Sequence, residues 1–156
     1  MKDKIKAKAI GFSLSKITTE QFAVIETNFP EDEKEIGIGM NFRFSASETQ
    51  KMLGVFTTFT FQVEEKQFLI VEAGCHFKIK PEDWDNLLND DKTELTVPKG
   101  LISHLATITV GTTRGILHAK TENTIFNKYH LPTINVSEVI NKDSVFTFSN
   151  DSKLID

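Results

Sequence analysis

The chain has 156 residues, a formal net charge of −4, 39% hydrophobic and 26% charged residues, and a single cysteine. These values are typical of one soluble globular domain, and the mild acidity argues against a nucleic-acid-binding protein, which needs a basic stripe. No run approaches the roughly 20 apolar residues of a membrane span, and no apolar run follows the charged N-terminus as in a signal peptide. A lone cysteine fits a reducing compartment, so we expect a cytoplasmic protein.

The first predicted strand covers Ile5 to Ser15, where apolar side chains alternate with lysines until Gly11 interrupts the pattern. An interruption of this kind predicts a bend or bulge. The polar residues Thr18 to Gln21 are a candidate turn, and the apolar residues after them are a candidate extension of the strand. A loop is expected from Asn28 to Lys34, where a proline and an acidic run follow one another.

The strongest pattern lies between Ile36 and Lys80, where apolar side chains recur at every second position through three successive runs. A period of two is typical of half-buried strands. The polar stretches Ser45 to Lys51 and Glu64 to Lys66 are the expected turns. We therefore predict three antiparallel strands with one apolar face, which another part of the chain must cover.

A short helix is predicted over Pro81 to Asn89, because proline and acidic residues favour a helix start. After a polar loop, a long helix is expected to begin at Pro98 and to end near residues 120–123. Its apolar residues recur every three to four positions, which outweighs the competing strand suggested by the β-branched residues between Thr107 and Thr113.

The remaining chain is predicted to contain an extended connector at His130 to Thr133 and a short helix over Val136 to Asn141, capped by Asn135. Residues 126–129 fit no single pattern. The alternation at residues 145–148 is compatible with a strand or with a frayed tail. We therefore expect an α+β fold in a single domain spanning residues 1–156, with a core at 5–141 and a tail at 142–156.

The chain contains no recognisable catalytic constellation, so we predict no enzyme, no metal and no cofactor. Cys75 and His76 are adjacent on a strand and point to opposite faces, so they cannot form a thiolate–imidazole pair, and Cys75 is expected in the core. His104 and His118 are about 21 Å apart along the helix, and neither metal-ligand spacing nor a phosphate-binding loop is present. Arg114 is either an anchor for a backbone carbonyl or a solvent-facing side chain.

Aromatic residues give the main functional signal, because the chain has 13 phenylalanines. They are either all core or partly a binding surface. Four aromatic residues lie off the main core face or in loops and are our candidates for contacting a partner: Phe22, Phe29, Phe56 and Trp84. The stripe of the long helix is broad enough to pack on two sides. Its second side, expected to form an oligomer interface, contains Ile102, Ala106, Val110 and Leu117.

The order of elements over residues 5–141 resembles that of the bacterial SecB export chaperones. Three segments carry the resemblance: Val71–Ile79 (VEAGCHFKI), Arg114–Gly115, and Leu131–Val136 (LPTINV). The family has a four-stranded antiparallel sheet followed by a long helix and a short C-terminal helix, and the resemblance implies that fold here.

The resemblance also implies a function. SecB proteins are cytosolic, ATP-independent holdases that assemble as a dimer of dimers, bind unfolded polypeptides in aromatic and aliphatic grooves, and pass them to a SecA-type motor. We expect a homo-oligomeric chaperone of this kind, without a cofactor. The alternative is a non-catalytic protein-binding module, or an antitoxin-associated chaperone whose partner is a toxin–antitoxin component.

Overall fold

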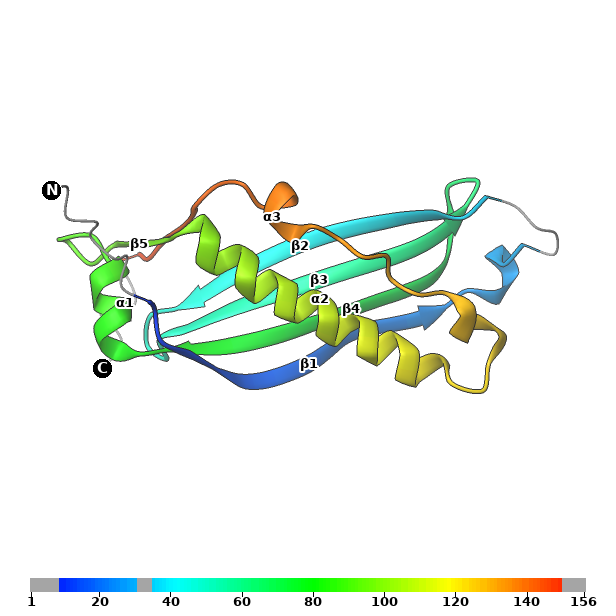
Figure 1. Cartoon of the computed structure of the whole chain (residues 1–156), viewed down its shortest axis with the longest axis horizontal. Coiled ribbons are helices and arrows are strands. Elements are labelled where there is room, and N and C mark those ends of the chain that lie inside the picture. Colours follow the sequence, from blue (N-terminus) through cyan, green and yellow to red (C-terminus); the bar gives the residue numbers. More distant parts are fainter. Residues whose placement is uncertain (1–8, 31–34, 150–156) are drawn as a thin grey trace, which may run out of the picture.

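A four-stranded antiparallel sheet carries the fold of the computed structural model, which describes residues 9–30 and 35–149. The spatial order of its strands is β1-β4-β3-β2 (Figure 1). The strands are β1 (Phe12–Val24), β2 (Gly37–Ser47), β3 (Met52–Val63) and β4 (Lys66–Ile79). The three strands predicted between residues 36 and 80 are confirmed, and so is the α+β class with a long and a short helix.

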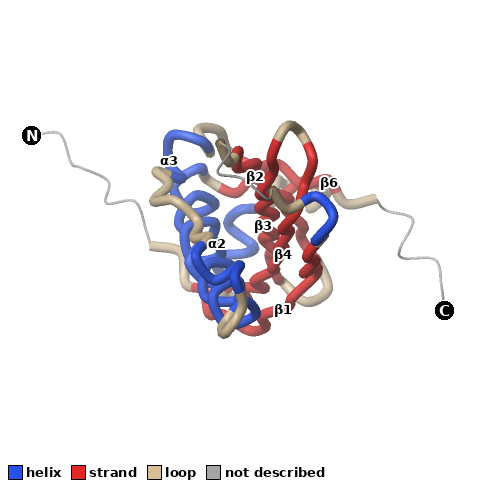
Figure 2. The backbone as a smooth tube through the Cα atoms, turned by 90° about the vertical axis from the view of Figure 1, so that its right-hand side faces the viewer, coloured by secondary structure: helices blue, strands red, loops and turns tan. Residues whose placement is uncertain are grey.

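Helix α2 (Lys99–Thr121) crosses one face of this sheet, so the structure has a helical layer and a sheet layer (Figure 2). It packs mainly on β3 and β4, the two central strands. The alternate residues of these strands that face α2 are buried, among them Cys75, as predicted. The core contributed by the two strands on this face includes Leu53, Val55, Phe59, Phe61, Leu69, Val71, Phe77 and Ile79.

The threonines of α2 explain how a β-branched sequence forms a helix here. Buried Thr109 and Thr113 donate hydrogen bonds to the carbonyl oxygens four residues earlier, at 2.9 Å and 2.7 Å. Thr113 also contacts Thr57 of β3, with 2.6 Å between the two hydroxyl oxygens. Because each buried hydroxyl has a partner, the polar groups do not oppose packing of the helix on the sheet.

The first strand differs from its prediction. It begins at Phe12 and continues through the predicted turn, while residues 5–8 lie outside the described part of the chain. The register with β4 shifts between Leu14 and Lys16 and again between Thr19 and Gln21. The polar residues at 18–21 therefore mark a bulged strand at the sheet edge, where water reaches the polar side chains.

The end of the sheet beyond β4 carries α1 (Pro81–Leu87), as predicted, and a second sheet that was not predicted. Strand β5 (Glu94–Val97) pairs antiparallel with β6 (Ser144–Thr147). Residues 144–147, which the prediction assigns to the tail outside the core at 5–141, thus form a strand of this second sheet. The pairing joins segments that are distant along the chain, which a local pattern cannot show.

After α2 the chain forms the 3₁₀ turn η2 (Ile125–Lys128) and returns along the helix to α3 (Val136–Val139). A second 3₁₀ turn, η1 (Glu26–Asn28), follows β1. Arg114 donates a hydrogen bond of 3.1 Å from Nη2 to the Pro132 carbonyl oxygen. Of the two roles considered for Arg114, the structure therefore supports the anchor for a backbone carbonyl. Asn135 is the N-cap residue of α3, as predicted, but its side chain makes no capping hydrogen bond; its Oδ1 accepts a bond from the Ser137 hydroxyl instead.

Within the described residues, no helix has both the length and the apolar character needed to cross a membrane.

The Thr57–Thr113 pair gives a test of this packing. Because Thr113 donates to Thr109, it must accept the proton of Thr57. Thr113→Val therefore leaves a buried donor without an acceptor and should lower the free energy of unfolding by about 1–3 kcal/mol, whereas Thr57→Val should have a smaller effect. The double variant should recover most of the loss. Urea denaturation checks this; equal losses for the two single variants would contradict the assignment.

Candidate functional site

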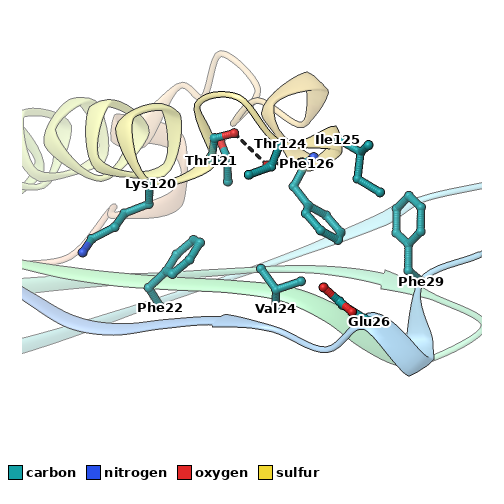
Figure 3. A pocket seen from close by; sticks show the side chains of 9 residues that line it. All are labelled: Phe22, Val24, Glu26, Phe29, Lys120, Thr121, Thr124, Ile125 and Phe126. Atoms are coloured by element: carbon teal, nitrogen blue, oxygen red, sulfur yellow. Dashed lines mark hydrogen bonds between the residues drawn. The ribbon is translucent and has the colours of Figure 1, made fainter.

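An apolar pocket of about 500 Å³ lies where the end of α2 faces the end of β1. Figure 3 shows side chains from both layers pointing into it: Phe22 and Val24 rise from β1 toward Phe126, which descends from η2. The nine lining residues are Phe22, Val24, Glu26, Phe29, Lys120, Thr121, Thr124, Ile125 and Phe126. The pocket therefore contains two of the four aromatic residues predicted to contact a partner, Phe22 and Phe29.

A cluster of aromatic rings supports one side of this pocket. Phe29 packs edge-on against Phe68, with 5.4 Å between ring centroids, and against Phe126, with 5.1 Å. Tyr129 lies 5.1 Å from Phe68 by the same measure. Edge-to-face contacts of this kind add to the gain from apolar burial. Phe29 and Phe126, two of the rings that wall the pocket, are therefore held in place by contacts with other rings.

A bulge puts Phe68 into this cluster. In the register of β3 with β4, Phe61 faces Leu69 and Gln62 faces Gln67, so Phe68 is the additional residue of β4. An extra residue in one strand turns a side chain away from strict alternation. Phe68 and Leu69 are therefore both fully buried although they are neighbours.

The upper wall depends on how α2 ends. Asn123 has φ 62°, a left-handed conformation that asparagine tolerates and that turns the chain out of the helix. The Thr124 hydroxyl then donates to the Thr121 carbonyl oxygen at 2.7 Å and accepts from the Phe126 amide at 3.2 Å. These bonds hold Ile125 at the mouth of the pocket, where 63% of it is exposed.

The chemistry of the pocket is that of an apolar receptor. Among its nine described lining residues, Glu26 and Lys120 are the charged ones, and none is a cysteine or a histidine. Among residues 9–30 and 35–149, no group of three or more histidine, cysteine, aspartate or glutamate side chains could hold a metal ion. The arrangement suits apolar side chains flanked by charges of either sign.

Phe56 does not belong to an open groove. It lies on the sheet face opposite α2 but is only 7% exposed, because neighbouring side chains cover its ring. The Arg43 guanidinium carbon is 4.0 Å from the ring centroid, and the His76 ring packs edge-on at 5.4 Å. Below it are Gly54 and Gly74, where an added Cβ would come within 3.0 Å or less of the ring. Phe56 is thus a packing residue that covers glycines.

Trp84 was also predicted to contact a partner, but its side chain is 0% exposed. Its indole nitrogen donates to Glu48 Oε2 at 3.1 Å, and its ring lies 6.4 Å from that of Phe148 by centroid distance. The residues that contact Trp84, Glu48 and Phe148, come from segments distant along the chain. Trp84 therefore packs α1 against the rest of the fold, and its buried side chain is not available to contact a binding partner.

The predicted oligomer interface is wrong for a similar reason. Ile102, Ala106, Val110 and Leu117 are all buried, and they belong to the side of α2 that packs on its own sheet. The half-buried apolar residues of the helix are instead Leu101, Ile108 and Ile116, together with Thr112. The broad apolar stripe of α2 does not by itself determine which of its residues face the sheet, because this depends on the angle at which the helix crosses the strands.

Several residues at the site were not among those predicted. Val24, Ile125 and Phe126 line the pocket, and Leu14 and Ile17 are about half exposed earlier on the same strand β1, at 45% and 50%. The apolar pair Ile125–Phe126 after the helix end was a usable signal, because such residues near a chain reversal usually have a packing partner.

Comparisons with known proteins identify no family. No protein-family model matches the chain, and no curated protein matches it. Among solved structures, a protein of unknown function from Streptococcus agalactiae aligns with 81% of this chain and 99% of its own, at 12% sequence identity and a TM-score of 0.36. Similarity at that level assigns neither a family nor an activity, so the resemblance to SecB stays a prediction.

The pocket predicts binding of an environment-sensitive apolar dye near Ile125. Ile125→Ser should weaken dye binding severalfold while changing the free energy of unfolding by less than about 0.5 kcal/mol, because the side chain is mostly exposed. Val139→Ser is the matched control, since Val139 is also exposed but does not line the pocket. Fluorescence titration measures both variants, and equal weakening by the two would contradict a specific pocket.

Proposed function

We propose that this protein binds non-native polypeptide without nucleotide, as an ATP-independent holdase of the SecB-like kind. The observation that carries the proposal is an apolar track: the exposed Leu14 and Ile17 on edge strand β1 lead along that strand to the pocket walled by Phe22 and Val24. Apolar contact is non-directional and tolerates many sequences, which suits clients that share only exposed hydrophobic residues.

The chemistry of the track supports binding over catalysis. A holdase needs exposed apolar surface beside a stable scaffold, and the two occur here together. The walls of the pocket are fixed by aromatic packing and by the hydrogen bonds of Thr124, whereas Leu14, Ile17 and Ile125 stay accessible. Glu26 and Lys120 at the pocket keep charges of both signs beside the apolar surface.

A second candidate is a module that binds one specific partner, including a toxin–antitoxin component. The size of the pocket favours it, because about 500 Å³ accommodates only a few side chains and can select among them. A module of this kind would bind one peptide tightly and leave the aggregation of unrelated proteins unchanged.

The assembly and cellular setting are part of the same proposal. A cytoplasmic homo-oligomer, with a SecA-type motor as a further partner, is what the resemblance implies. Ile102, Ala106, Val110 and Leu117 are no longer candidates for the contact between subunits, because the sheet of the same chain covers them. The mass in solution should therefore be measured together with the activity.

The test is suppression of aggregation of a reduced, unfolded client by stoichiometric protein without nucleotide, followed by light scattering. The exposed large apolar residues provide matched variants. The track variant replaces Leu14, Ile17 and Ile125 by serine, and the control replaces Ile38, Val139 and Val145, which are exposed elsewhere. The wild type and the control should suppress aggregation, and the track variant should lose most of the effect.

Two results would contradict the proposal. A folded wild-type protein that leaves client aggregation unchanged would exclude a holdase. Equal losses in the track variant and the control would show that general surface hydrophobicity, and not the track, is responsible. Circular dichroism of all three proteins verifies that they are folded.

A further inference from the structure

We infer that the bound polypeptide adds to the sheet as a further strand along the open edge of β1. This inference rests on the proposed function and specifies its client: an extended segment with apolar side chains at every second position. The hydrogen-bonding groups of the β1 backbone, together with the side chains of the track, would recognise it.

Among the described residues, no strand pairs with the outer edge of β1. β1 is 13 residues long, and within the described residues it pairs with β4 alone. Every second residue of such a strand directs its N–H and C=O groups away from the sheet, where they can pair with another chain. Main-chain pairing is independent of client sequence, which suits a protein that must hold many chains.

The exposed apolar side chains of β1 point to the helix side of the sheet. Leu14 lies opposite Phe77 and Ile17 opposite Cys75, and these β4 residues belong to the core layer beneath α2. Opposite residues of paired strands point to the same face, so Leu14 and Ile17 also point to the helix side. An added strand would place alternate side chains on this side, next to those two residues.

The pocket lies further along the same face of β1. Further along β1, Phe22 lies opposite Val71 and Val24 opposite Leu69, so both also point to the helix side, where they wall the pocket. Because of the two bulges, Leu14 and Val24 lie opposite residues that are eight positions apart on β4, Phe77 and Leu69. This corresponds to about 26 Å along the sheet. An extended segment of about nine residues can therefore pair with β1 and insert an apolar side chain into the pocket.

The bulges of β1 set where pairing is regular. Unshifted stretches of register run from Phe12 to Leu14, from Lys16 to Thr19 and from Gln21 to Val24. The last of these leads directly into η1 and the pocket, so we assign the main contact of the client to it.

The opposite edge offers a weaker site. β2 has a regular register, but of its apolar side chains on the helix side only Ile38 is largely exposed, whereas Met40 and Phe42 are half-buried. The pocket at that end of the sheet is lined mainly by polar groups, including Glu35, Gln62 and Glu65. An apolar client gains less there than along β1.

The experiment uses the full chain and three fluorescent peptides of nine residues with alternating valine and threonine and lysines at the ends. One is unmodified, one is N-methylated at its odd-numbered interior positions and one at its even-numbered interior positions. Successive amides of a strand point in opposite directions, so only one set faces β1. The peptide methylated at the amides that face β1 should bind at least about tenfold more weakly than the unmodified peptide, because its hydrogen bonds are blocked. The other methylated peptide should bind within about threefold of the unmodified one. Fluorescence anisotropy measures each affinity.

Other outcomes overturn the inference. Equal affinities for the three peptides, or equal losses for both methylated sets, would mean that side chains alone are captured. Failure of the unmodified peptide to bind a protein that still suppresses aggregation would remove strand addition and leave the proposed function, whereas absence of both activities would remove the proposed function itself. A dimer that Leu14→Lys and Ile17→Lys convert to monomers, and that does not bind the peptide, would assign the edge to a second copy of this chain.

Discussion

Burial of one face of β3 and β4 beneath α2 is the contact on which the other features depend. It fixes the helix diagonally across the central strands, with the Thr57–Thr113 hydrogen bond inside the contact (Figure 1). The chain that follows returns on the β2 side of α2, where Arg114 holds the backbone at Pro132. The β1 side lacks such a covering segment among the described residues, so Leu14 and Ile17 remain exposed there.

Much of this architecture could be predicted because its signals are local. A period of two over residues 36–80 gave three strands, and apolar spacing from residue 101 gave the long helix despite its threonines. The features that were missed depend on distant partners. β5 and β6 are short and gain stability only from each other and from contacts such as that of Trp84 with Phe148. No pattern in either segment predicts which other segment it pairs with.

The candidate site was only half predictable, for a related reason. Off-pattern aromatic residues suggested a binding surface, and Phe22 and Phe29 do line the pocket. Phe56 met the same criterion, yet Arg43 and His76 cover its ring. The position of a residue on a strand predicts the direction of its side chain, but it does not predict which other side chains cover it. Ile125 became a site residue only because the turn at Asn123 directs η2 over the end of β1.

The central claim is that the β1 edge and its pocket receive the client, and amide hydrogen exchange tests it most directly. A strand added to β1 must protect those β1 amides that face away from β4, chiefly between Gln21 and Val24. We expect their exchange to slow when an unfolded client is bound, while the exchange of β2 amides stays unchanged. Slowing confined to β2, or to the sheet face around Phe56, would contradict the account.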